Sequence, residues 1–220
     1  MTLELGDHVW YWNGNISLEK SIPRAQWFPN SNPNDPNDYL GHGKEIYNFV
    51  IHADEIVRGR PHMRNHEGSF AWLNNNPGNI TGSIGGHDYG QYPDKFNWHN
   101  FLIFPTWNDG FNAIASLLRS PAYADLSIQA GFNKYAPASD GNNPFAYAET
   151  VAAALSHEGV TVDTRIGDLT DGQMVVMQNK IQEVEGAIPG DSFTWESADI
   201  PTEIASQLPA SVSPVEEEIQ

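Results

Sequence analysis

The groups best suited to chemistry in this sequence are a carboxylate and an amide-rich turn that follows it at short range. Glu67 precedes residues 74–79, which read NNNPGN. This run cannot propagate a helix or a strand, because proline lacks an amide donor and asparagine side chains compete for backbone hydrogen bonds. Asparagine and glycine tolerate left-handed backbone angles and proline fixes one dihedral, so we expect a rigid loop that presents amides to a ligand.

Aromatic residues of the kind that stack on sugar rings lie near this loop in the sequence. The expected binding residues are the loop amides and these aromatics, namely Asn75, Asn76, Asn79, Trp72, Tyr89, Tyr92 and Trp98. An isolated N-P-G-N segment is usually only a structural turn, and it is the combination with Glu67 and the aromatics that favours a ligand site. A carboxylate, amides and aromatic rings together indicate a glycan site, in which Glu67 is the candidate for a catalytic residue.

Cleavage of a glycosidic bond needs a carboxylic acid that is still protonated when it meets the leaving oxygen. Burial in an apolar cleft raises the pKa of a glutamate, and Glu67 precedes the apolar residues 70–72, although a lone glutamate is more often a solvated surface charge. A two-carboxylate mechanism needs a second acid, for which Asp88 and Asp94 are the candidates. A one-acid mechanism needs only Glu67, and both mechanisms stay open.

Other catalytic chemistries have weaker sequence signals. A zinc site could be assembled from His62, His66, His87, His99 and Asp88. Because the chain has no H-E-x-x-H or H-x-H motif, we expect no metal ligand and no cofactor. The absence of cysteine excludes thiol chemistry, and there is neither a G-x-S-x-G motif nor a phosphate-binding glycine loop followed by lysine.

Length and composition limit the classes of protein to which the chain can belong. With 220 residues, 40% of them hydrophobic, the chain can form one domain of ordinary size with tails. No apolar run approaches the length of about eighteen residues that a membrane span needs. The net charge of −17 disfavours nucleic acid as a partner, because phosphate contacts require basic residues.

The localisation stays open. Residues 1–7 contain neither the basic nor the apolar segment of a cleaved export signal. We therefore expect that delivery to the cell envelope or the extracellular space would need a particle or a secretion machine.

The spacing of apolar residues predicts the elements that must position these groups. Helices are expected over 44–58, after a cap at 106–108, over 127–134, after the Asn143-Pro144 cap, and over 171–185. In the last helix the residues expected to face inward are Met174, Met177, Ile181 and Val184. Residues 101–104 are expected to form a buried strand, and the glycine-rich residues 82–86 a hairpin or a flap.

The order of motifs between residues 44 and 160 resembles a known family. The motifs are Glu67-Gly68, residues 74–80, Phe104, Asp109-Gly110-Phe111, Lys134-Tyr135-Ala136-Pro137 and the helix that begins at Asn142-Asn143-Pro144-Phe145-Ala146-Tyr147. This series is similar to the NNNPGN-type lysozyme-like domains of bacterial, phage-tail and contractile-injection-system proteins.

The resemblance implies an α+β, mostly α fold, in which a lysozyme-like helical domain with a small β-hairpin or flap covers residues 44–190. It implies that Glu67 is the catalytic acid, that the amide loop lines the glycan groove, and that Tyr135 lies near the acid. The implied activity is cleavage of peptidoglycan glycan strands by a muramidase or a lytic transglycosylase, so that hydrolysis and anhydro-product formation are both open.

Residues outside this domain are expected to be irregular extensions. Residues 1–43 form an aromatic, Asn/Pro-rich arm that either folds back on the domain or docks to a phage-like or secretion particle. Residues 191–220 form an acidic, flexible tail, because residues 181–220 hold nine carboxylates and no lysine or arginine. Two other classes stay open, a non-catalytic glycan-binding or structural component of a phage-like particle and a zinc hydrolase.

Overall fold

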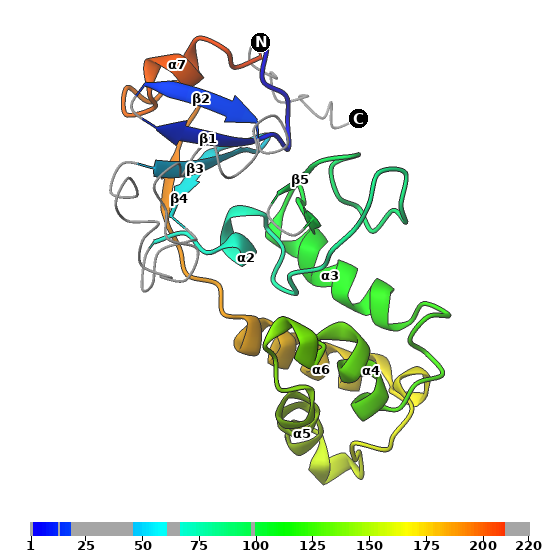
Figure 1. Ribbon diagram of the computed structural model, residues 1–220. Helices are drawn as coiled ribbons and strands as arrows, with labels where there is room; N and C mark the ends of the chain where they lie inside the picture. Colours follow the sequence, from blue (N-terminus) through cyan, green and yellow to red (C-terminus); the bar gives the residue numbers. More distant parts are fainter. Residues whose placement is uncertain (1, 13, 19–45, 61–66, 98–99, 210–220) are drawn as a thin grey trace, which may run out of the picture.

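The computed structural model describes residues 2–12, 14–18, 46–60, 67–97 and 100–209. It combines an antiparallel sheet, to which both ends of the described chain contribute, with a group of helices (Figure 1). None of the helices among these residues has the length and apolar character needed to span a membrane. Four residues named above lie outside the described ranges, namely Trp98, His62, His66 and His99.

Five strands form one antiparallel sheet in the order β2-β1-β3-β4-β7. They are β1 (His8–Trp12), β2 (Asn15–Leu18), β3 (Ile46–Ile51), β4 (Ile56–Gly59) and β7 (Asp191–Phe193). The prediction of a helix over residues 44–58 is therefore wrong. This stretch forms β3 and β4, joined by a turn in which the backbone amide of His52 donates to the carbonyl oxygen of Glu55 at 2.9 Å.

Both faces of the sheet are covered, which explains the misleading pattern. Phe49 and Ile51 belong to one apolar cluster with Ile204, whereas Val50 belongs to another with Ile103. A strand that is buried on both faces reads as a continuous apolar run, and such a short run does not distinguish a strand from a helix.

Parts of the expected arm and tail belong to this sheet. Trp10 in β1 is only 4% exposed, and β1 pairs with β3. At the other end β7 pairs with β4 and is followed by α7 (Thr202–Ala205), whose Ile204 is buried. The backbone amide of Leu3 donates to the carbonyl oxygen of Gln207 at 2.7 Å, which joins the two ends. The sheet therefore crosses the expected boundaries at 43 and 190, while residues 19–45 and 210–220 lie outside the description.

The helices largely follow the sequence prediction. The main ones are α3 (Trp107–Leu118), α4 (Ile128–Tyr135), α5 (Pro144–Ala154) and α6 (Asp171–Glu185). Their N-cap side chains, which each accept a backbone hydrogen bond, belong to Thr106, Ser127, Asn143 and Thr170. The inward positions of α6 are confirmed except at Val184, whose side chain is 46% exposed. Short 3₁₀ turns follow α4 and α5: η5 (Ala138–Asp140), η6 (Ser156–Glu158) and η7 (Ile166–Asp168).

The helical unit leaves the sheet and returns to it at neighbouring points. After β4 the chain forms the single-turn helix α2 (Phe70–Leu73), and after α6 it runs to β7. At the crossing the backbone amide of Ser69 donates to the carbonyl oxygen of Ile188 at 2.9 Å, and the amide of Ile188 donates to Ser69 Oγ at 3.0 Å. The unit is thus inserted between two adjacent strands.

A two-stranded ribbon lies beyond the amide loop. It consists of β5 (Phe96–Asn97) and β6 (Phe101–Leu102), so the strand expected over 101–104 is found in its first half. Residues 82–86 contain a turn at 84–85 and no strand, so they form no hairpin, and the alternative of a flap stays a prediction. Thr81 makes an isolated bridge with Phe101.

Candidate active site

The rigid amide loop has the backbone angles that its sequence predicts. Asn75 and Asn79 have φ angles of 50° and 45°, which asparagine tolerates better than most residues. Helix α3 packs tightly against the loop, because a Cβ atom built on Gly110 would lie 1.8 Å from the carbonyl oxygen of Asn75. Only glycine fits at this point, so the first turn of α3 fixes the position of the loop.

Two of the side-chain amides that were expected to bind a ligand form hydrogen bonds to the protein's own backbone instead. Asn76 is fully buried, and its Nδ2 donates to the carbonyl oxygens of Ile80 at 2.9 Å and Leu102 at 3.0 Å. Its Oδ1 accepts from the backbone amide of Ile80 at 2.9 Å. Asn75 Nδ2 donates to the carbonyl oxygen of Pro105 at 3.2 Å. These side chains stabilise the loop, and neither lines the cavity to which Asn79 belongs.

Asn79 is the loop amide that reaches a carboxyl group. Its Nδ2 donates to Glu185 Oε2 at 2.9 Å. Its Oδ1 is buried and has no hydrogen-bond partner among the described residues. The loop therefore presents one amide, whose acceptor end is left unpaired next to an acid.

Glu185 is the last residue of α6, and its carboxyl group lies between the amide loop and α5. Glu185 Oε1 accepts a hydrogen bond from the Tyr147 hydroxyl at 3.0 Å. Burial raises the pKa of Glu185, and the hydrogen bonds from Asn79 and Tyr147 offset only part of that effect. Burial also raises the pKa of Tyr147, so its hydroxyl stays neutral and can donate.

A cavity of about 810 Å³ opens at this carboxyl group. One wall comes from the loop and the ribbon, and the other from the end of α4, from η5 and from the segment before α5. The residues used below are Asn79, Tyr135, Asp140, Asn142 and Glu185. The cavity thus gathers two carboxyl groups, two amides and a phenol from segments far apart in the sequence.

Tyr135 lies in the cavity wall, next to the loop. Its hydroxyl donates to the carbonyl oxygen of Gly78, and burial raises the pKa of Tyr135 well above its ordinary value. A Cβ atom on Gly78 would lie 2.6 Å from this hydroxyl, so glycine is needed for the contact. Tyr135 is expected beside Glu67, but the carboxyl group that lies near it is that of Glu185.

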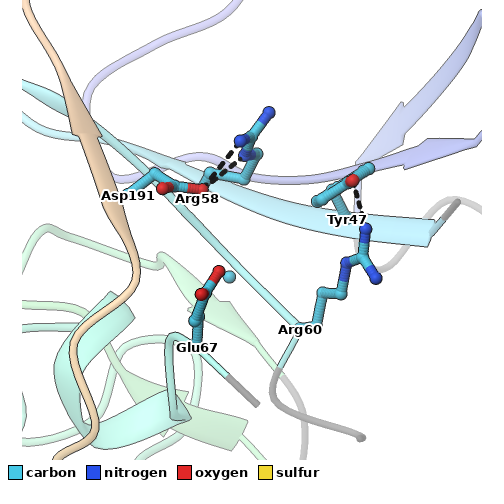
Figure 2. Close-up of a pocket in the computed structure, with 6 residues that line it drawn as sticks. Tyr47, Arg58, Arg60, Glu67 and Asp191 are labelled. Atoms are coloured by element: carbon cyan, nitrogen blue, oxygen red, sulfur yellow. Dashed lines mark hydrogen bonds and ion pairs between the residues drawn. The ribbon is translucent and has the colours of Figure 1, made fainter. Parts of the chain in front are cut away.

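Glu67 lies elsewhere, at the end of the sheet. Its side chain is exposed and lines a separate cavity of about 260 Å³ together with Tyr47, Arg58, Arg60 and Asp191 (Figure 2). Arg58 is paired with Asp191 at 2.7 Å, and Arg60 donates to the Tyr47 hydroxyl. No residue of the amide loop lines this cavity. Glu67 therefore lacks the buried surroundings, beside the loop, on which its expected role as an acid depended.

Glu67 is kept at the end of the sheet by a close backbone contact, at the point where the chain passes from the sheet to the helical unit. A Cβ atom on Gly59 would lie 2.6 Å from the carbonyl oxygen of Gly68, and the amide of Arg60 donates to the carbonyl oxygen of Glu67 at 2.8 Å. These contacts hold Glu67 against the end of β4, with α2 between it and the loop.

The other expected site residues that the structure describes do not line the cavity of Glu185 either. Trp72 and Tyr92 pack on the apolar cluster that contains Val50, and Tyr89 packs on the helical core. Asp88 accepts from the backbone amide of Gly90 at 2.8 Å. Asp94 accepts from that of Gly85 at 2.9 Å. Both carboxylates are exposed and stabilise turns, and none of these five side chains lines the cavity of Glu185.

Sequence reasoning missed Glu185 and Asp140. A glutamate at the end of a well-capped helix, directly before Gly186, was a usable signal, because the last side chain of a helix can project beyond the helical packing. Glu67 lies much closer to the loop in the sequence, and sequence reasoning selected it instead.

The described residues contain no group of three histidine, aspartate or glutamate side chains that could hold a metal ion, and three of the four candidate histidines lie outside them. Comparison of the chain with models of protein families, with curated proteins and with solved structures finds no match.

Proposed function

We propose that the protein cleaves glycosidic bonds in the glycan strands of peptidoglycan, with Glu185 as the general acid. The observation that carries this proposal is a partly buried carboxyl group with a raised pKa in the wall of a cavity of about 810 Å³. A cavity of this volume is large enough for a ligand of several rings. Neutral acid groups are what glycosidases use to protonate the leaving oxygen.

The contacts of Glu185 are compatible with proton transfer. Because burial favours the neutral form, more of Glu185 stays protonated near neutral pH than of a solvated glutamate. Asn79 and Tyr147 each occupy one acceptor position, one on each carboxyl oxygen. A carboxyl oxygen has a further position, which leaves room for the acid proton and a substrate oxygen.

Asp140 replaces Asp88 and Asp94 as the candidate for a second carboxylate. It is an exposed residue of η5 and lines the same cavity as Glu185. In a two-carboxylate mechanism Asp140 would activate water or stabilise the positive charge that develops on the sugar. In a one-acid mechanism a hydroxyl of the substrate attacks instead, and Glu185 accepts its proton after releasing its own.

The choice of peptidoglycan rests on the resemblance to the NNNPGN-type lysozyme-like domains. Three of the motifs that carry this resemblance, residues 74–80, 134–137 and 142–147, contribute Asn79, Tyr135 and Asn142 to the cavity. The third also supplies Tyr147, which donates to Glu185. The motifs thus meet around one acid, and this supports a common role for them.

Digestion of purified peptidoglycan tests the proposal. We expect the wild type and Glu67→Gln to release soluble fragments, and Glu185→Gln to release none while keeping its fold by circular dichroism. Mass spectrometry of the fragments separates hydrolysed ends from anhydro ends, and Asp140→Asn should abolish release only if a second carboxylate is required.

Three results would overturn the proposal. Full activity in Glu185→Gln would exclude Glu185 as the acid, and loss of activity in Glu67→Gln alone would return the role to Glu67. Binding of glycan strands without release of any fragment would assign the cavity to recognition only.

A further inference from the structure

A second cavity adjoins the first one at Glu185. It has a volume of about 290 Å³ and lies between the start of α5 and the end of α6, which are neighbouring helices (Figure 1). Glu185 and Asn142 belong to the walls of both cavities. Glu185 is therefore a wall residue shared by two adjoining cavities.

The smaller cavity has an apolar surface that nothing in the described chain covers. Val184 is 46% exposed although its position in α6 predicts an inward side chain, and it lines this cavity together with Ala146. Polar groups surround them. Asn143 and Thr150 are also in the wall, and Thr150 Oγ1 donates to the carbonyl oxygen of Ala146 at 2.8 Å.

This combination suits one face of a sugar ring. A pyranose ring has C–H groups that pack on small apolar side chains and hydroxyl groups at its edge that reach polar neighbours. A glycan strand that is cut at Glu185 must continue on both sides of the bond that breaks, because the leaving group and the remaining sugar each carry further units.

We infer that the smaller cavity is a second sugar subsite, so that the glycan strand crosses Glu185 and occupies both cavities. This inference rests on the proposed glycosidase function and deepens it. The protein cuts within glycan strands, and the larger cavity holds more sugar units than the smaller one, whose wall includes Ala146, Thr150 and Val184. Positions on α5 and α6 thereby contribute to the choice of substrate length.

Filling the smaller cavity without touching the acid tests this inference. Ala146→Trp places a large side chain in the cavity wall at an exposed helical position. Ala153→Trp is the matched control, because Ala153 is also an exposed residue of α5 but lines neither cavity. Both changes are made in the Glu185→Gln background, and binding of MurNAc-GlcNAc oligosaccharides of two, four and six units is measured by calorimetry.

We expect Ala146→Trp to weaken the binding of the longest oligosaccharide by about tenfold, the scale of losing one set of pocket contacts, and to leave the disaccharide almost unaffected. Ala153→Trp should bind every length as its parent does. Equal binding of all lengths by Ala146→Trp and its parent would overturn the second subsite while leaving the proposed function in place. If the parent binds no oligosaccharide and the wild type cuts no peptidoglycan, the proposed function fails, and this inference fails with it.

Discussion

Replacing Gly110 with alanine tests whether helix α3 sets the position of the amide loop and, through the loop, of Asn79. At an open position in a helix, a change from glycine to alanine stabilises a protein by up to about 1 kcal/mol. At Gly110 the new Cβ would lie 1.8 Å from the carbonyl oxygen of Asn75 and 3.0 Å from Cδ of Pro77. The oxygen belongs to the backbone, so it cannot turn aside as a flexible side chain could.

The helix or the loop would therefore have to move by about 1 Å, and strain of this kind costs about 1 to 3 kcal/mol. The middle of this range, about 2 kcal/mol, exceeds the helical gain of about 1 kcal/mol, and we expect Gly110→Ala to lower the free energy of unfolding by about 1 kcal/mol. The displaced loop also carries Asn79 away from Glu185. Misplacement by about 1 Å in an active site can reduce the rate by about a hundredfold, so peptidoglycan cleavage should fall on that scale.

Urea denaturation measures the first effect, and Gly172→Ala is the matched control. Gly172 lies in the first turn of α6, and a Cβ there would meet nothing within 4 Å. We expect this control to be at least as stable as the wild type and fully active. A denaturation midpoint that rises in Gly110→Ala, as in the control, would refute the view that α3 and the loop are packed without free space.

Two further predictions concern the carboxyl group itself. Because its pKa is raised in the folded state, Glu185 binds its proton more tightly there than in the unfolded chain, so the wild-type free energy of unfolding should fall as the pH rises from about 4 through the folded pKa. Glu185→Gln should lack this decline, and parallel curves for the two proteins in urea titrations at several pH values would contradict it. Tyr147→Phe removes a hydrogen bond that lowers the pKa of Glu185, so the pKa should rise further, and the loss of cleavage at high pH should move to higher pH. A pH–rate profile measures this shift, and a move to lower pH would count against Glu185 as the proton donor.

Local chemistry explains why most of the helices could be predicted. Thr106, Ser127, Asn143 and Thr170 cap helices through contacts with residues three positions away, and such contacts are visible in the sequence. The shape of the amide loop was predictable for the same reason, since asparagine, proline and glycine restrict their own backbone angles.

The strands depended on distant partners and were misread. Residues 46–51 pair with β1, and β4 pairs with a strand that follows more than a hundred residues later. Their apolar spacing fits a helix as well as a doubly covered strand, and only the pairing decides between the two.

The site was predictable only in part, because its acid and its amide are brought together by tertiary packing. Asn79 and Glu185 are separated by 106 positions in the sequence. The motifs around Asn79, Tyr135 and Asn142 could be recognised, yet nothing local connected them to the end of α6. Nearness along the chain favoured Glu67, which the contact between Gly59 and Gly68 keeps beside the sheet.

The way in which the helical unit joins the sheet has a consequence for the modularity of the protein. The outgoing strand β4 and the returning strand β7 are hydrogen-bonded to each other, and Ser69 and Ile188 link the two connections just beyond them. An insert whose ends meet in this way can be exchanged for another of different size without changing the register of its host. The sheet is thus closed by its own hydrogen bonds at this point. A different insert, with a different binding site, can be placed between β4 and β7 through this single pair of connections.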